Sequence, residues 1–419
     1  MALRTKKTKK PSQQPFKKPI PLVLDRVDRL AGDGYHCAFT AMTEWRGHYY
    51  IAFRYADTHN PTCQGVIRII RSKADFITIP SERMSVAAKW HHVKDIVIKD
   101  GDARDPKFIA IDDRDVLCVL YGVYFAHIGA GSVAHKRERD LVTCASFTHD
   151  GAAWGQAEQV SRPNYWLWSV IPVHEDEPSL YEYLYPDNVD DDEELARLKR
   201  KLKDKDDNPA IYAAAYHWGG RHEPTTINIF QSQHGYSYTW MNLLYGQKNP
   251  TEPVIFQPAA GKMVCMVRLD GSETFVMGHA DFPYIKWDWH EIGEWFQPSS
   301  VIQWNDRWLA SGRMCERDFG NWNTPSAGKS DHDTDYDWDN QAPVVSKVAL
   351  FEIGEKFDSI QYVMDLPSRG DCAYTGMALS PDEDELLISY YSQHQRPDKT
   401  YMDAPVPADV YLAHVKMKV

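Results

Sequence analysis

Several side chains able to bind anions or carry protons stand at the ends of strand-like runs in this chain of 419 residues. Arg104 and Asp105 belong to one run through the sequence Arg-Asp-Pro-Lys, and Arg268 and Arg313 end two others. A guanidinium presents a rigid fork of donors that matches a carboxylate, so these arginines are candidates for anion binding. Tyr374 lies between small residues, where its ring is free to project into a cavity. These residues predict one site for an acidic ligand, provided that the fold brings them together.

The fold that would position them is indicated by a repeat of short β-rich runs, each ending in polar residues and a turn. The pattern recurs over most of the chain: 35–56, 104–107, 166–174 with 210–218, 252–278, 301–313 and 373–391. Radial repetition of small sheets builds a β-propeller, which gathers distant Arg, His, Glu and Tyr residues around one central pocket. We therefore expect an all-β fold. A strand at 21–27 is expected to complete the last blade and close the ring.

Composition excludes several classes of protein. Aromatic residues make up 12% of the chain, which suits strands and surfaces that stack on sugars. No apolar run is long enough to span a membrane, and the first residues lack the apolar core of a signal peptide, so we expect a cytoplasmic or particle-associated protein. The seven cysteines are dispersed, odd in number and never form a CxxC pair. Buried free thiols are therefore expected.

Charge is distributed unevenly along the chain. The net charge is −12, yet residues 1–18 hold seven Lys or Arg residues and no acid. The acidic body disfavours nucleic acid and anionic membranes as partners, so an anionic substrate requires a local arginine cluster. We expect residues 1–18 to be a flexible basic arm that could dock on an acidic partner or a neighbouring subunit, and 19–419 to be the folded domain.

Two segments interrupt the β pattern and are expected to be insertions, 175–208 and 316–341. In the first, acidic residues followed by basic residues over 190–207 favour a short surface helix, because they match the helix dipole. In the second, alternating acids over Asp331–Asp339 could supply oxygen ligands for a structural Ca²⁺, although a solvated loop is the commoner outcome. No other cofactor or metal is expected.

Two turns and a series of short motifs carry a resemblance to a known family. Thr148–Trp154 and Ser232–Trp240 look like degraded Asp-box turns, in which the Trp would pack between blades. Further motifs occur in order along the chain: Tyr35–Thr40, Ala52–Tyr55 with His59, Asp102–Lys107, Tyr165–Trp168, Thr251–Val254 with Arg268, Ser311–Met314, and Gly370–Gly376 with Ser389–Ser392. Together they resemble the sialidase-like (BNR-repeat) propellers over most of residues 30–419. The resemblance implies a single six-bladed β-propeller.

The resemblance also implies roles for individual residues. Sialidases hold the substrate carboxylate with arginines and use a Tyr nucleophile activated by a Glu, with an Asp as acid and base. By motif position, Glu252 matches the activator, Tyr374 the nucleophile, and Asp105 is the nearest available acid. A phenol is a poor nucleophile until a base takes its proton, which is the purpose of such a pair. The carboxylate would be held by the arginines Arg54, Arg104, Arg268 and Arg313.

The sequence departs from the family pattern at His36, where sialidases carry the first clamp arginine in an Arg-Ile-Pro motif. His36 or His59, with Tyr374 and the arginines, could instead serve a uronate lyase, in which a base takes the proton α to a neutralised carboxylate. A non-catalytic glycan-binding or assembly propeller is the third interpretation. Each role also has a structural alternative: Arg104 and Asp105 could simply form an ion pair between blades, and His36 could be a hydrogen-bonded structural histidine.

The sequence therefore predicts a carbohydrate-active enzyme, an exo-glycosidase of sialidase-like type acting on a terminal acidic sugar of a glycan or oligosaccharide. The predicted catalytic residues are Tyr374, Glu252, Asp105 and His36. The predicted substrate-binding residues are Arg54, His59, Arg104, Arg268, Arg313 and His394.

Overall fold

The computed structural model describes residues 21–59, 64–111, 114–125, 141–178, 209–217, 224–317, 344–395 and 407–418. Three predicted features lie outside these residues: the basic arm 1–18, the helix within 190–207 and the acidic loop 331–339. Of the two expected insertions, the structure describes the first residues, 175–178 in one and 316–317 in the other.

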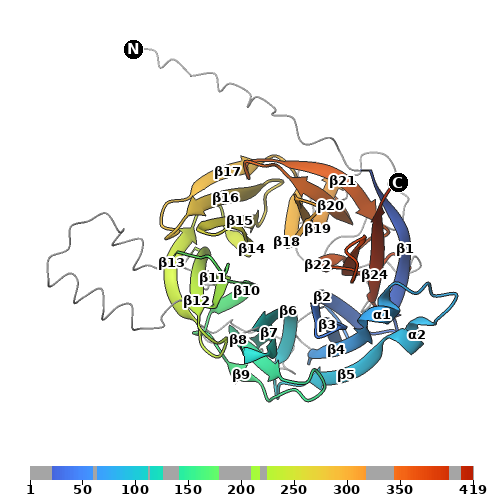
Figure 1. Ribbon diagram of the computed structural model, residues 1–419. Coiled ribbons are helices and arrows are strands. Elements are labelled where there is room, and N and C mark those ends of the chain that lie inside the picture. The colour runs from blue at the N-terminus through green and yellow to red at the C-terminus, as the bar shows by residue number, and fades with distance from the viewer. Residues whose placement is uncertain are drawn as a thin grey trace, which may run out of the picture.

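Six four-stranded antiparallel sheets are arranged around a central axis, which confirms the predicted six-bladed propeller (Figure 1). The innermost strands of the six blades are β2 (His36–Trp45), β6 (Asp102–Ile111), β10 (Tyr165–Pro172), β14 (Pro250–Ala259), β18 (Phe296–Trp304) and β22 (Ala373–Leu379). Each blade is named below by its innermost strand. Blades that are neighbours in this order pack against each other, and the β22 blade packs on the β2 blade.

The outer strands follow in sequence within each blade. They are β3 (His48–Ala56), β4 (Val66–Lys73), β5 (His91–Ile96), β7 (Val116–Tyr124), β8 (Leu141–Thr148), β9 (Glu158–Gln159), β11 (Ile211–His217), β12 (Thr226–Ser232), β13 (Thr239–Tyr245), β15 (Lys262–Leu269), β16 (Phe275–Asp281), β17 (Asp288–Ile292), β19 (Arg307–Arg317), β20 (Val344–Ile353), β21 (Ile360–Leu366), β23 (Glu385–Ser392) and β24 (Asp409–Met417). Two short helices, α1 (Ala74–Ile77) and α2 (Val86–Lys89), lie between β4 and β5. Neither of these helices has the length or the apolar character to cross a membrane.

The ring is closed by the N-terminal strand. β1 (Leu22–Ala31) pairs antiparallel with β24 and forms the outer edge of the β22 blade, so the first and last described strands share one sheet (Figure 1). This confirms the strand predicted at 21–27, which extends four residues further than expected. Joining the two ends of the chain in one blade prevents the ring from opening between its first and last sheets.

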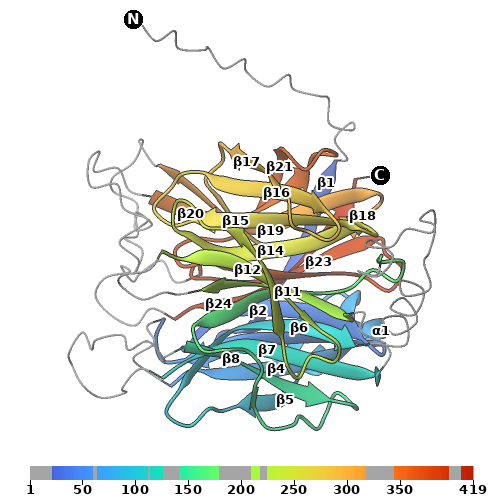
Figure 2. The same ribbon diagram turned by 90° about the vertical axis from the view of Figure 1, so that its left-hand side faces the viewer.

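The core lies between the blades, which stack face to face (Figure 2). Six apolar clusters of the described residues each join one blade to the next, such as the cluster that packs Trp166 and Trp168 of the β10 blade against Met263 and Cys265 of the β14 blade. Six of the seven cysteines are described; all six are buried, and no disulfide joins any two of them, as the sequence predicts. The propeller is thus held together by interfaces between sheets rather than by cross-links.

In both predicted turns, a side-chain hydroxyl accepts from the backbone N–H three residues later, Thr148 from Gly151 and Ser232 from Gly235. In the first, the Asp150 carboxylate also accepts from two following backbone N–H groups. Trp154, at the end of this turn, is buried as predicted. The prediction is wrong for Trp240, which is 47% exposed, because it lies on the outermost strand β13 and donates its indole N–H to Asn228.

Every innermost strand carries a β-bulge at an equivalent position. The extra residue is Phe39, Asp105, Trp168, Glu252, Ser299 or Tyr374 in the six blades, as the register shifts show. Four of them have a positive φ: Phe39, Asp105, Glu252 and Tyr374. A bulge re-aims its side chain relative to the regular pleat, and a non-glycine residue with positive φ costs of order 1–3 kcal/mol. The propeller therefore repeats a β-bulge around its axis, and the backbone is strained in four of the six bulges. Three of the predicted catalytic residues occupy strained bulge positions.

Candidate active site

The geometry at the propeller axis is dominated by a contact between two of these bulge residues. The Tyr374 hydroxyl donates to the Glu252 carboxylate over 2.8 Å, although the two residues are 122 positions apart. Arg268 donates to the same carboxylate oxygen over 3.0 Å and lies 3.4 Å from the phenol oxygen. The Arg313 guanidinium lies 5.6 Å from the centre of the Tyr374 ring. The structure thus brings these four predicted residues together.

Aromatic rings from the β2 and β10 blades and from its own blade hold the Tyr374 ring in place. It packs against Phe39 and Trp168, with ring centres 5.2 and 5.7 Å away, and it stacks on Tyr391. The backbone carbonyl of Tyr374 accepts from the Thr40 hydroxyl over 2.8 Å, which ties the β22 bulge to the β2 bulge. Rigid packing of this kind keeps the phenol oxygen in one position relative to its partners.

The electrostatic environment keeps Tyr374 protonated until a base acts on it. Burial and the neighbouring Glu252 charge raise the pKa of the phenol well above its ordinary value, and Arg268 and Arg313 partly offset the rise. A phenol in this state is a hydrogen-bond donor and a weak nucleophile. Transfer of its proton to Glu252 would generate the reactive phenolate beside two guanidinium groups, which would stabilise its charge.

Asp105 and Arg104 form a second group, on strand β6. The Arg104 Nε atom lies 3.5 Å from the Asp105 carboxylate, and its Nη1 atom lies 3.6 Å from Asp102. The sequence suggested an ion pair between blades as the alternative to catalysis, but these three residues all lie on β6, and both distances are long. Burial and the nearby Glu252 charge raise the pKa of Asp105 to about 6, against the lowering effect of Arg104 and Lys107. Asp105 is therefore a carboxyl group able to hold a proton close to neutral pH.

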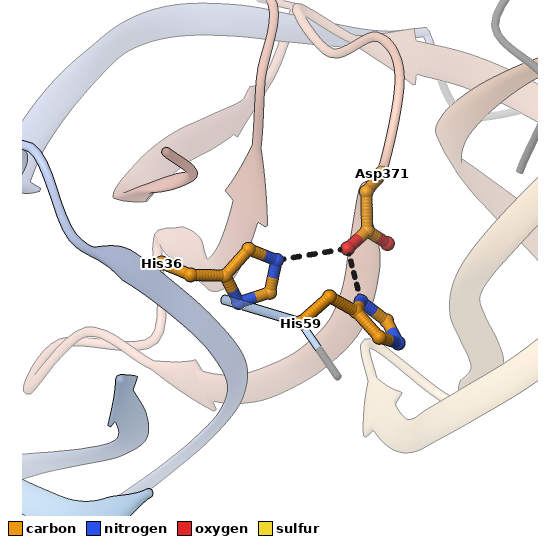
Figure 3. Close-up of side chains that lie close together, drawn as sticks. All are labelled: His36, His59 and Asp371. Atoms are coloured by element: carbon orange, nitrogen blue, oxygen red, sulfur yellow. Dashed lines mark hydrogen bonds and ion pairs between the residues drawn. The ribbon is translucent and has the colours of Figure 1, made fainter. Parts of the chain in front are cut away.

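A third group surrounds Asp371, a residue that the sequence analysis did not select. One of its carboxylate oxygens lies 3.0 Å from His36 Nε2 and 2.5 Å from His59 Nδ1 (Figure 3). The other oxygen accepts from the Tyr391 hydroxyl over 2.6 Å and from Arg313 over 3.4 Å. Burial opposes ionisation of Asp371, but the two histidines, His59 and His36, outweigh it and hold the pKa of Asp371 well below the ordinary value. Burial also lowers the pKa of both histidines, to about 3 for His59.

The same three residues are the candidate metal ligands of the described chain, with one ligand atom each, all within 4.8 Å of one another. Two imidazoles and one carboxylate can bind a transition metal. Here, however, the carboxylate already accepts hydrogen bonds on both oxygens, and the Arg313 guanidinium lies beside it. A cation would face this positive charge with one carboxylate to offset it. We therefore interpret the group as a hydrogen-bonded network that fixes His59 and Arg313.

The remaining predicted residues occupy different positions. His36 is 1% exposed and hydrogen-bonded to Asp371, so we interpret its imidazole as part of the network that holds Asp371. Arg54 is fully buried, donating to Asp102 over 2.8 Å and to the Thr58 carbonyl over 2.6 Å, so it supports the carboxylate beside Arg104. His394 contacts the Ser392 hydroxyl and the Tyr411 ring. None of the interactions described for His394 reaches Tyr374 or Glu252.

Three further residues of the site were missed by the sequence reasoning. Asp371 stands three positions before Tyr374 in a motif that was already identified, and its acidic side chain beside that motif is the signal that could have found it. Lys107 follows Asp105 on the same strand, and its ammonium lies 5.0 Å from the centre of the Trp168 ring. Tyr391 lies within the Ser389–Ser392 motif and is buried, and its hydroxyl is part of the Asp371 network.

Comparisons with known proteins bear on the fold. No protein-family model matches the sequence, and no curated protein matches it. Among solved structures, the Hadza microbial sialidase Hz136 is similar with a TM-score of 0.52 at 11% identity, over 92% of this chain and 67% of that protein. Similarity at this identity establishes the fold, so the sialidase-like propeller architecture inferred from the motifs is confirmed.

Two other solved structures cover most of this chain with lower scores. A mutant of the Trypanosoma rangeli sialidase that displays trans-sialidase activity has a TM-score of 0.47 at 10% identity, over 90% of this chain and 54% of that protein, so this chain spans about half its length. An exo-β-1,3-galactanase from Clostridium thermocellum has a TM-score of 0.43 at 8% identity, over 88% and 73%. Each of these neighbours is named for an activity on glycosides.

Proposed function

We propose that this protein is a retaining exo-glycosidase in which Tyr374 is the nucleophile, acting on a terminal acidic sugar. The observation that carries the proposal is the contact of 2.8 Å between the Tyr374 hydroxyl and Glu252, with Arg268 on the same carboxylate oxygen. A nucleophile hydrogen-bonded to a base, with the base oriented by a third group, is the arrangement that covalent catalysis requires. The similarity in fold to sialidases supports the proposal but does not carry it.

In the first step, the Tyr374 oxygen attacks the anomeric carbon of the terminal sugar while its proton passes to Glu252. The bond between the anomeric carbon and the glycosidic oxygen breaks, and the leaving oxygen takes a proton from Asp105. The product is a glycosyl–tyrosine intermediate and a free alcohol. A neutral phenol suits this attack because an anionic nucleophile would be repelled by a carboxylate on the sugar.

In the second step, Asp105, now ionised, takes a proton from a water molecule that attacks the anomeric carbon. The bond to the Tyr374 oxygen breaks, and the phenolate regains its proton from Glu252. Two displacements at one carbon retain its configuration, and the net reaction consumes one water molecule. The pKa of Asp105, raised to about 6, suits both roles, because the group holds its proton in the first step and accepts one in the second.

The test is incubation of the protein with a panel of oligosaccharides that end in sialic or uronic acids, with detection of released sugar. Tyr374→Phe should abolish release while leaving the circular dichroism spectrum and the unfolding midpoint unchanged. A sugar analogue bearing fluorine beside the anomeric centre should label Tyr374 covalently, as peptide mass spectrometry would show. Full turnover by Tyr374→Phe, or labelling of another residue, would refute the nucleophile assignment.

The same panel separates hydrolysis from elimination. A uronate lyase would produce an unsaturated uronate that absorbs ultraviolet light, with no uptake of water. We expect no such absorbance, because both candidate bases, His36 and His59, are held by the Asp371 carboxylate, and His36 is only 1% exposed. Appearance of the unsaturated product, with no labelling of Tyr374, would replace the glycosidase proposal by the lyase.

A further inference from the structure

Several buried polar atoms that lack a hydrogen-bond partner lie on or next to the innermost strands of the propeller. Within the described residues, they include Asp102 Oδ2, Arg104 Nε, Glu252 Oε2, Arg268 Nε and the indole nitrogen of Trp168. A buried polar atom without a partner carries a desolvation cost, so a native structure rarely keeps several of them side by side. Three of these residues, Glu252, Arg268 and Trp168, contact Tyr374, so the atoms mark a surface that a polar ligand would complete.

Two of the arginines expected to clamp a carboxylate are already engaged. Arg268 donates to Glu252 and lies 2.9 Å from Asp270. Arg313 donates to the Cys372 carbonyl, to the Gln297 amide oxygen and to Asp371, over 2.9, 3.1 and 3.4 Å. A substrate carboxylate at either guanidinium would have to share it with a protein carboxylate of the same charge.

Arg104 differs from these two in its contacts. Its carboxylate neighbours, Asp105 and Asp102, lie 3.5 and 3.6 Å away, longer than a normal N–H···O hydrogen bond. Its guanidinium is held mainly by aromatic rings, 4.7 Å from the centre of Phe39 and 5.8 Å from that of Tyr124. Stacking of this kind fixes the plane of a guanidinium and leaves its edge available to a carboxylate.

Lys107 is the second cation of this strand. Its ammonium lies 5.0 Å from the centre of the Trp168 ring, and no hydrogen bond or ion pair of Lys107 occurs with another described residue. The bulge at Asp105 gives Arg104 and Lys107 partners on β7 that are two residues apart, Gly122 and Leu120. Two residues two apart on a strand share a face of the sheet, so Arg104 and Lys107 share one as well.

We propose that Arg104 and Lys107 form the subsite that binds the carboxylate of the acidic sugar, in place of a clamp made by Arg268 and Arg313. This inference rests on the proposed function and assigns to Lys107 a role in substrate specificity. Phe39 and Trp168, which carry the two cations, both contact the Tyr374 ring, so the subsite lies next to the nucleophile. When Asp105 is protonated, it no longer places a negative charge between Arg104 and Lys107 on strand β6.

The test measures binding without turnover, in the Tyr374→Phe protein as parent. Isothermal titration calorimetry with N-acetylneuraminic acid and glucuronic acid, each beside its neutral methyl ester, gives the preference for the charged form. We expect the parent to bind one acid more tightly than its ester. Lys107→Met and Arg104→Met should each weaken binding of that acid by about 10- to 100-fold, as expected for the loss of a charge-assisted hydrogen bond, and should leave binding of the ester unchanged.

Matched variants separate the subsite from general damage. Lys94→Met, at an exposed position on the outer strand β5, should leave both affinities unchanged, and Lys107→Arg should restore most of the preference for the acid. If Arg104→Met proves unstable, the comparison of Lys107→Met with Lys107→Arg tests the subsite by itself. The inference is overturned if Lys107→Met still binds the acid more tightly than its ester. It is also overturned if the parent shows no such preference or binds neither acid. Turnover by the Tyr374→Phe parent would instead refute the nucleophile assignment. The binding comparison between acid and ester would still test the subsite.

Discussion

The assignment of Asp105 as the general acid predicts a specific dependence of the rate on pH. Its pKa is raised to about 6, chiefly by burial, and the group must be protonated to release an alcohol leaving group. The protonated fraction is one half at pH 6 and about one hundredth at pH 8, so kcat/KM should fall about 50-fold between them. An ordinary carboxyl in water would already be ionised at pH 6, so the position of this limb reports the environment of Asp105.

The perturbation that tests the assignment is Asp105→Asn, assayed on two glycosides of one acidic sugar. With a sugar alcohol as leaving group, kcat/KM should drop by about 10²- to 10⁴-fold, the usual contribution of general acid catalysis. With 4-nitrophenol, which leaves without a proton, the loss should be about tenfold or less, and the decline above pH 6 should disappear. Asp288→Asn, at an exposed position on β17, is the control and should change neither rate. An equal loss on both glycosides would refute the acid role.

Three further predictions concern stability. Asp371→Asn should lower the free energy of unfolding in urea by about 3–5 kcal/mol, because it removes the carboxylate beside the buried Arg313; an unchanged midpoint would contradict this. Gly122→Ala should cost about 1–3 kcal/mol, because a Cβ would lie 2.1 Å from the Trp166 ring, whereas Gly293→Ala, with no atom within 4 Å, should be nearly neutral in the same titration. Asp105→Asn should raise the melting temperature at pH 7 but not at pH 4. The pKa of Asp105 is about 6 in the folded protein and 3.8 ordinarily, so ionisation favours the unfolded state. As pH rises from 3.8 to 6, the free energy of unfolding of the wild type therefore falls by up to about 3 kcal/mol.

The sequence predicts the fold well because a propeller repeats its signals. Each blade contributes apolar alternation and a turn, and six weak signals in order are more informative than any one of them. The closing strand was predictable for the same reason, because a ring needs its first strand beside its last. The exposed Trp240 shows the limit: a local turn motif does not determine whether the following residue lies between blades or on the outermost strand.

The site was less predictable, because its contacts depend on registers that no local pattern encodes. Tyr374, Glu252 and the two arginines around them were found through motifs. Asp371 was not, because its importance comes from four donors supplied by other parts of the chain. Lys107 was not selected either, because only the bulge at Asp105 places it on the face of Arg104.

The recurring bulge connects the fold to the proposed chemistry. A positive φ at a residue other than glycine costs stability, and the propeller accepts this cost at Phe39, Asp105, Glu252 and Tyr374. Glycine would relieve the strain at each position but would remove the side chain. At three of the four, the side chain is one to which we assign a catalytic role, and at the fourth it is the ring that carries Arg104 and packs on Tyr374. Because glycine would remove these side chains, the strain at the four positions supports the site that we propose at the axis of the propeller.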